Sequence, residues 1–119
     1  MDIYNAFIAR EKELQFYEGK PVINKRLAFY DINDDPWDFS LAIGYTFKIW
    51  EEREGGLLMI DWSDTAGNLA LSGSHPHEII LNAPRADTDI ERGWYYYEIE
   101  YLIEGGYTIL IGYGRVKFI

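Results

Sequence analysis

The carboxyl-terminal residues 93–119 have the pattern of two antiparallel strands joined by a glycine turn, and this pattern limits the fold more than any other part of the chain. In residues 93–103, every second side chain is apolar: Tyr95, Tyr97, Ile99, Tyr101 and Ile103. Alternation with a period of two is typical of a half-buried strand. Gly105 and Gly106 can adopt the positive φ angles of a tight two-residue turn, because neither has a Cβ atom. We therefore predict a hairpin that turns at these two glycines.

The composition favours one β domain that includes residues 1–119. A chain of this length forms a single domain and buries roughly 65% of its unfolded surface. Hydrophobic residues make up 48% of the chain and aromatic residues 17%. Because aromatic side chains fit pleated, half-buried surfaces better than helices, we predict a mostly β structure. For residues 1–16 the sequence leaves two alternatives, an arm or an extra strand.

Turn residues divide the middle of the chain into short segments with strand character. The predicted strands are residues 22–32, 41–50, 57–62, 69–71 and 79–82. A single helical turn is predicted over residues 87–93, with Asp87 or Thr88 as its cap and Gly93 as its end. Seven or eight short strands without long alternating helices favour a two-sheet antiparallel β-sandwich.

Side-chain parity predicts two further details. In the strand at residues 22–32, Ile23 is expected to share a face with Leu27. In the last strand, the apolar residues before and after Gly112 and Gly114 have opposite parity. A β-bulge at these glycines, or burial of both faces, would explain the change. The final residues keep strand character, so we expect them to pair within a sheet or against another subunit.

The charge of the chain limits its partners. Twenty acidic and eleven basic residues give a formal charge of −9. This charge repels a phosphate backbone over about 8–10 Å, so we expect no nucleic-acid partner. No uncharged apolar stretch approaches the ~20 residues of a membrane span, and no basic leader precedes an apolar run, so we expect no membrane contact and synthesis in the cytosol. The chain has no cysteine, which excludes disulfides and thiolate metal sites.

Two polar loops imitate metal sites. Residues 75–78, His-Pro-His-Glu, combine imidazole and carboxylate groups that bind zinc, but the proline and the preceding Ser-Gly-Ser favour an exposed turn. Alternating oxygen donors that resemble a calcium loop occur at Asp31, Asn33 and Asp35. That segment lacks the turn glycine and the closing glutamate of an EF-hand, although a different oxygen-rich calcium site stays open there. We predict no metal site and no cofactor.

Candidate catalytic groups match only common patterns. Glu98 and Glu100 lie on one strand face roughly 7 Å apart, a separation at which carboxylate pairs hydrolyse glycosides. Any two acidic residues at positions i and i+2 satisfy this spacing, so a solvated strand face is favoured, and Asp61 and Asp64 are interpreted in the same way. The sequence has no Gly-x-Ser-x-Gly elbow and no complete phosphate-binding glycine motif. We predict no catalytic residues and no enzymatic activity.

Aromatic and apolar side chains are the best candidates for a binding surface. Trp37 lies in a predicted loop, and Trp50 and Tyr96 lie on the predicted outward parity of their strands. These rings could form a stacking platform for sugars, but packing or a protein interface is favoured. The other apolar side chains predicted to face outward are Leu102 and either Ile109 or Ile111.

The order of the segments resembles that of a known family. The resemblance is found in the strand 41–49 (Leu-Ala-Ile-Gly-Tyr-Thr-Phe-Lys-Ile), the turn 64–68 (Asp-Thr-Ala-Gly-Asn), and the segment 86–99, which leads through a glycine turn to residues 111–116 (Ile-Gly-Tyr-Gly-Arg-Val). From about residue 17 onward, the chain resembles the N-terminal domain of bacteriophage baseplate upper proteins and related phage tail modules. The ending is the most specific part, and the match includes no catalytic or ligand motif.

This resemblance implies an immunoglobulin-like β-sandwich. It also implies a structural component of a phage or prophage tail, in the baseplate or at a fibre attachment, which is synthesised in the cytoplasm of the bacterial host and located in the virion. Such a module would bind other tail or baseplate proteins, and copies of itself as a homo-oligomer, through sheet edges and its aromatic face. Family members continue into a longer region, so we expect a small adaptor or a fragment. The alternative is a carbohydrate-binding module with an exposed aromatic platform.

Overall fold

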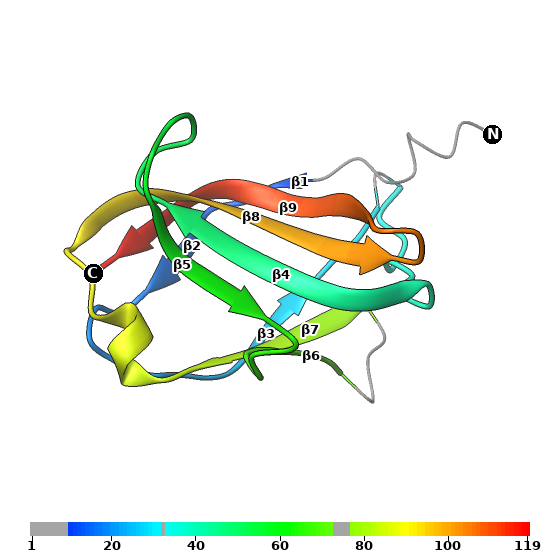
Figure 1. Cartoon of the computed structure of the whole chain (residues 1–119), viewed down its shortest axis with the longest axis horizontal. Helices are drawn as coiled ribbons and strands as arrows, with labels where there is room; N and C mark the ends of the chain where they lie inside the picture. Colours follow the sequence, from blue (N-terminus) through cyan, green and yellow to red (C-terminus); the bar gives the residue numbers. More distant parts are fainter. Residues whose placement is uncertain (1–9, 32, 73–76) are drawn as a thin grey trace.

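The computed structural model describes residues 10–31, 33–72 and 77–119, which form two β-sheets packed face to face (Figure 1). The larger sheet has the strand order β1-β9-β8-β4-β5, with β2 also paired to β9, and the smaller sheet has the order β3-β7-β6. The strands of the larger sheet are β1 (Arg10–Glu11), β2 (Leu14–Phe16), β4 (Ala42–Trp50), β5 (Leu58–Ser63), β8 (Gly93–Ile103) and β9 (Tyr107–Phe118). Those of the smaller sheet are β3 (Val22–Ala28), β6 (Leu69–Leu71) and β7 (Glu78–Ala83). The predicted two-sheet β-sandwich is confirmed.

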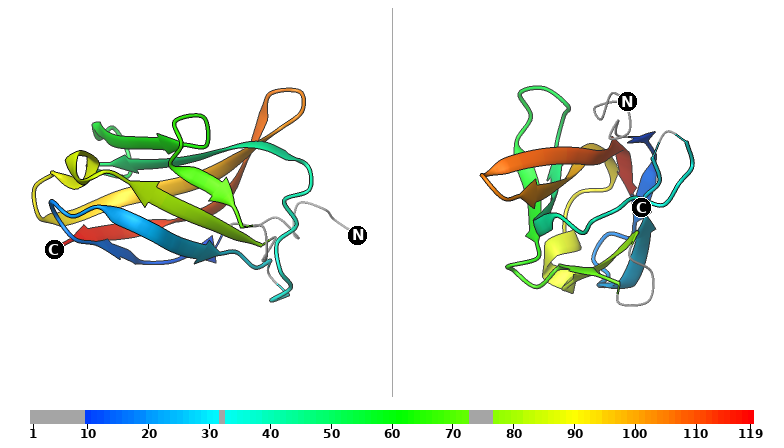
Figure 2. Two further views of the ribbon diagram at one scale, coloured as in Figure 1. Left: turned by 90° about the horizontal axis from the view of Figure 1, so that it is seen from below. Right: turned by 90° about the vertical axis from the view of Figure 1, so that its right-hand side faces the viewer.

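The topology is that of an immunoglobulin-like sandwich. The neighbours β9, β8, β4 and β5 correspond to strands G, F, C and C′ of such domains, and β3, β7 and β6 correspond to B, E and D. Near the start of β8, the Tyr95 hydroxyl donates a hydrogen bond to the Glu91 carbonyl oxygen at 2.5 Å, which forms the tyrosine corner of this fold. Figure 2 shows the two layers from two further sides.

The amino-terminal strands depart from the predicted antiparallel arrangement. β1 and β2 both run parallel to β9, so residues 10–16 form an extra, interrupted strand. Between them, the Lys12 amide donates to the Tyr113 carbonyl oxygen at 2.9 Å. A Cβ atom at Gly114 would overlap the Lys12 carbonyl oxygen, so this close crossing requires a glycine. β9 is therefore paired on both sides over its second half, from Gly112 to Phe118.

The carboxyl-terminal hairpin confirms the prediction with one correction. Ile103 pairs with Tyr107, so the loop contains three residues and not two. Gly105 and Gly106 both have positive φ, 95° and 83°, as predicted from their lack of a side chain. The predicted bulge is confirmed as well, because the register of β8 and β9 shifts between Ile99 and Glu100 and leaves Ile111 as the extra residue.

The core lies between the two sheets and is rich in aromatic rings. Phe16 from β2 meets Phe47 and Trp62 edge to face, with ring centroids 6.2 and 5.6 Å apart. Such edge-to-face pairs are favourable beyond the area that they bury. The largest fully buried side chains are Trp62, Tyr97, Phe47, Phe118, Ile49, Ile79, Leu81, Ile99 and Val116. The aromatic excess of the sequence therefore serves mainly to fill the space between the sheets.

Side-chain parity failed where the register shifts. Ile23 is 72% exposed and not in the core, because Asn24 has a positive φ and the pairing of β3 with β7 slips between Val22 and Lys25. β4 has a register slip of its own between Ala42 and Gly44, and Ile43 at this slip is 61% exposed. A bulge adds one residue and thereby turns the next apolar side chain to the opposite face.

The helical turn η1 (Arg85–Thr88) begins earlier than predicted and has a different cap. Its first residue follows Pro84, and no side chain caps it, so Asp87 and Thr88 are not the cap. Thr88 is instead the buried last residue, whose hydroxyl donates to the Lys20 carbonyl oxygen at 2.6 Å. Gly93 starts β8 and does not end the helix. In the described ranges, no helix has the length and apolar character that a membrane crossing needs.

Candidate functional site: an aromatic and cationic sheet face

Trp37, the loop residue considered as part of a sugar platform or an interface, is in the core. It is only 3% exposed, because the β3–β4 loop folds over the end of the sandwich and pairs the Trp37 amide with the Phe29 carbonyl oxygen at 3.0 Å. Its indole packs against Phe39 and Tyr101, each with ring centroids 6.4 Å apart. Burial raises the pKa of Tyr101, and the nearby indole partly offsets this effect. Trp37 therefore stabilises the loop and is not a surface platform.

Ile111 is also buried, contrary to its prediction as an outward residue. It is 3% exposed because it is the extra residue of the β9 bulge, and it packs in the core. Ile109 is partly buried and packs against the same core. Neither isoleucine belongs to an exposed patch, because the bulge directs both toward the smaller sheet.

Tyr96 and Trp50 do lie on the outer face of the larger sheet. They are opposite each other on β8 and β4, with ring centroids 6.4 Å apart. Trp50 is half-buried, but Tyr96 is only 8% exposed because the Arg53 guanidinium lies 5.5 Å from its ring centroid. Burial, followed by the neighbouring Glu98 carboxylate, raises the pKa of Tyr96. Both side chains therefore face outward, as predicted, but the Arg53 side chain covers the Tyr96 ring.

The most exposed ring of this face is Trp94, which the sequence interpretation did not single out. It is 46% exposed, and the Arg115 guanidinium and the Lys117 ammonium lie 4.3 and 5.3 Å from its ring centroid. Lys117 is the direct neighbour of Trp94 in the β8–β9 register, and Arg115 is the neighbour of Tyr96. A detectable signal was present, because Trp94 shares the parity of Tyr96, and Arg115 and Lys117 alternate with the core residues of the last strand.

A groove runs along this outer face, which we call the Trp94 face and define by Trp50, Arg53, Trp94, Tyr96, Arg115 and Lys117. Its volume is about 420 Å³, and it lies between the β4–β5 loop and the edge where β1 pairs with β9. The residues that line it are Glu11, Glu51, Glu52, Arg53, Trp94, Tyr95, Tyr96, Tyr113, Gly114 and Arg115. Aromatic and arginine side chains with an accessible groove are typical of binding surfaces.

The paired carboxylates belong to the same outer face and have cross-strand neighbours. Glu98 lies between Lys48 of β4 and Tyr113 of β9 in the sheet register, and Glu100 lies opposite Thr46. This arrangement is a solvated cross-strand ladder.

Asp64 forms two hydrogen bonds with the backbone of Tyr45. Its carboxylate accepts the Tyr45 amide at 3.0 Å, and its own amide donates to the Tyr45 carbonyl oxygen at 3.2 Å. These two bonds hold the end of β5 against β4. Asp61, its partner in the sequence interpretation, is exposed opposite Lys48.

One of the two segments that imitate metal sites, the one at Asp31, is held by hydrogen bonds of its own aspartate. The Asp31 carboxylate accepts the amides of Asn33 and Asp35 at 2.8 and 3.1 Å, which is a turn stabilised by its aspartate. His77 lies near the Tyr30 hydroxyl, 3.4 Å from its Nε2 atom, and His75 lies outside the described residues. Within the described residues, no three His, Cys, Asp or Glu side chains gather as a metal site would require.

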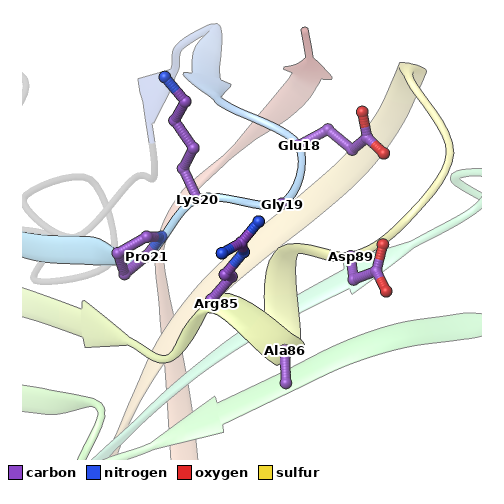
Figure 3. Close-up of a pocket in the computed structure, with 7 residues that line it drawn as sticks. All are labelled: Glu18, Gly19, Lys20, Pro21, Arg85, Ala86 and Asp89. Atoms are coloured by element: carbon purple, nitrogen blue, oxygen red, sulfur yellow. The ribbon is translucent and has the colours of Figure 1, made fainter.

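A second depression, of about 850 Å³, lies between η1 and the β2–β3 turn (Figure 3). In Figure 3, the Arg85 side chain points toward Gly19, and the Lys20 side chain extends away from the depression. The carboxylates of Glu18 and Asp89 lie on the side opposite to Lys20. Glu18 already pairs with Arg92 at 3.0 Å. Because these charged groups do not converge on one point, the depression provides no ligand-binding arrangement that compares with the Trp94 face.

Comparison with known proteins adds little to this geometry. No protein-family model matches the chain, and no curated protein matches it. One similar solved structure is the crystal structure of CopC from Methylosinus trichosporium OB3b, which is 13% identical, with a TM-score of 0.43. The match covers 89% of this chain and 82% of that chain. A similarity this distant says nothing about what this chain binds.

Proposed function

We propose that the protein is a non-enzymatic assembly module that binds partner proteins through the Trp94 face. The supporting observation is the half-exposed Trp94, which lies under Arg115 and next to Tyr96 beside an accessible groove. Tryptophan, tyrosine and arginine are the residues that contribute most to binding energy at protein interfaces. The rigid strands β8 and β9 hold them in place, so a partner loses little entropy in ordering the surface.

The proposed assembly is a phage or prophage tail, in the baseplate or at a fibre attachment. This part of the proposal is supported by the segment order of residues 41–116 and does not depend on the Trp94 face. The gene neighbourhood tests it directly. Flanking tail-fibre, tape-measure or lysis genes are expected, and a locus without any virion genes would contradict the proposal.

Binding to the proteins encoded nearby tests the Trp94 face. Each neighbouring tail protein is purified and its affinity for the chain is measured by biolayer interferometry. Trp94→Ala is expected to weaken the productive pair by about tenfold or more, as for an interface hot spot. Tyr107→Ala is the control, because Tyr107 is 70% exposed but starts β9 beside the turn, away from the groove. Equal affinity of wild type and Trp94→Ala would place the interface elsewhere.

Self-association is proposed at the edge of the larger sheet. Among the described strands, β5 pairs only with β4. The residue before it and its first two residues, Leu57, Leu58 and Met59, are apolar and 70, 47 and 37% exposed. Unpaired edges with apolar side chains favour pairing with another chain. Light scattering is expected to show an oligomer that Leu58→Lys dissociates. A strict monomer at high concentration would contradict a homo-oligomer.

The geometry favours a protein partner over a sugar. Trp37 is buried, and one side of the Trp94 ring is already covered by Arg115, so a continuous row of open rings is missing from the Trp94 face. The carbohydrate-binding alternative therefore depends on Trp50. Glycan-array binding that Trp50→Ala abolishes, with the fold intact, would favour that alternative.

A further inference from the structure

The groove of the Trp94 face is bounded by carboxylates as well as by rings. Glu51 and Glu52 come from the β4–β5 loop at one end, and Glu11 comes from β1 at the opposite side. Glu51 is close enough to raise the pKa of Tyr95, after burial and Glu91, and Glu11 contributes in the same way at Tyr97. The carboxylates and the aromatic side chains thus share one space.

The balance of charge in this groove is negative. Arg115 pairs with Glu13 in an exposed ion pair, with 2.8 Å between Nη2 and Oε1. Within the described part of the chain, no basic group lies within ion-pair distance of Glu11, Glu51 or Glu52. Among the residues that line the groove, the three carboxylates of Glu11, Glu51 and Glu52 therefore outnumber the two guanidinium groups of Arg53 and Arg115, and the whole chain has a formal charge of −9. A cleft of one sign attracts ligands of the opposite sign.

The rings of the groove already bind cations within the molecule. Trp94 has Arg115 and Lys117 over its ring at 4.3 and 5.3 Å, and Tyr96 has Arg53 at 5.5 Å. Aromatic faces attract cations through their quadrupole, most strongly for tryptophan and where water is partly excluded. Tyr113, which also lines the groove, has no such cation among the described contacts. The groove therefore combines the two features that recognise a cationic side chain.

We infer that the groove receives an arginine or lysine side chain from a basic segment of a partner protein. The inference rests on the proposed assembly function and specifies the chemistry of the partner. The incoming cation lies between Tyr113 and the carboxylates of Glu51 and Glu52, while the remaining basic residues of the segment follow the acidic surface. Glu11 closes the opposite side of the groove.

A tri-arginine amide peptide is the probe for this inference. Its binding to the intact chain is followed by calorimetry, with a tri-glutamine amide peptide as the neutral comparison. We expect binding of the arginine peptide only, and we expect it to weaken strongly as salt rises from about 50 to 500 mM, because salt screens exposed charges. Equal affinity for both peptides would overturn the inference.

Two double variants locate the binding site. Glu51→Gln/Glu52→Gln is expected to weaken the arginine peptide by about fivefold, as the loss of two exposed ion pairs predicts. The matched control, Glu54→Gln/Glu104→Gln, removes the same charge from exposed residues that do not line the groove, and we expect a change of less than about twofold. An equal loss in both variants would show that only the net charge matters, which would overturn the site.

Three further outcomes test the nature of the ligand and separate this inference from the proposed function. If spermidine binds as tightly as the arginine peptide, the ligand is a free polyamine, and the protein segment is wrong. If a tail protein binds through Trp94 but is insensitive to Glu51→Gln/Glu52→Gln, the cationic partner is wrong while the assembly function stands. If the arginine peptide binds the groove but none of the neighbouring proteins does, the assembly function fails and the cation site stands.

Discussion

The two faces of the larger sheet carry the same kinds of side chains in two different environments. The inner face places Phe47, Trp62 and Tyr97 against the smaller sheet, where each is at most 2% exposed. The outer face places Trp94 in solvent at 46% exposure, with the side chains of Arg115 and Lys117 over its ring. An aromatic ring on the inner face contributes to stability, and one on the outer face is available for binding.

The largest difference between the faces is expected for matched tryptophan substitutions. Trp62→Ala should lower the free energy of unfolding by about 3–5 kcal/mol, because it opens a cavity and removes the indole bond to Asp87 at 2.9 Å. Trp94→Ala should cost less than about 1 kcal/mol, the scale of an exposed cation–π contact. Urea denaturation followed by circular dichroism measures both values. Equal losses would mean that the outer face is also part of the stabilising core.

Two glycine substitutions test how much the close approach of residues 10–16 to β9 contributes to stability. Gly114→Ala is expected to cost about 1–3 kcal/mol, because its Cβ would strike the Lys12 carbonyl oxygen and its φ is 150°. Gly67→Ala is the control, since Gly67 also has a positive φ of 86° but has open space around it. Hydrogen exchange should show early loss of protection in residues 10–16 for Gly114→Ala alone. Similar exchange in both variants would assign the effect to backbone strain only.

Alkaline pH tests the inner tyrosines. Burial raises the pKa of Tyr97 far above its ordinary value of 10.0, and its hydroxyl donates to the Lys12 carbonyl oxygen at 2.6 Å. A folded pKa above the unfolded one gives stability that is fully present below about pH 10 and is lost as pH rises further. The free energy of unfolding should therefore fall above about pH 10, and Tyr97→Phe should fall less steeply, with a loss of about 1 kcal/mol at neutral pH. Identical slopes would contradict the assignment to Tyr97.

The smallest effect is expected on the outer ladder. Glu98→Gln removes one charge from the row that includes Lys48, and we expect a change of less than about 0.5 kcal/mol because exposed charge pairs contribute little. Thermal denaturation at low and high salt measures this change. A loss above about 2 kcal/mol would show that Glu98 is more than a solvated cross-strand partner.

Much of the fold could be predicted because its signals are local. The alternation in residues 93–103, the strand at residues 69–71 and the glycine turn all depend on neighbouring residues, and each was placed correctly or within one residue. The face error at Ile23 falls where the register of β3 slips, and Leu27, which follows the slip, is buried as predicted. No local pattern marks those slips at Ile23 and Ile43.

The candidate site was predictable only in part. Trp50 and Tyr96 were placed on the correct face by parity alone. Trp37 was included among the surface candidates because a loop that folds back over a core cannot be distinguished by sequence from one that extends into solvent. Trp94 was overlooked because its significance depends on Arg115, which is distant in sequence and becomes its neighbour only through the pairing of β8 with β9.

The amino-acid sequence by itself determined the strand-forming segments, their turns and the aromatic material of the core, because side-chain alternation and glycine conformations act over a few residues. Only the tertiary structure decided which rings are buried and which remain in solvent. It brought Lys12 over Gly114, folded Trp37 inward and set cations beside Trp94, since these contacts join residues from distant strands. The groove on the outer face exists for that reason, as a product of strand pairing.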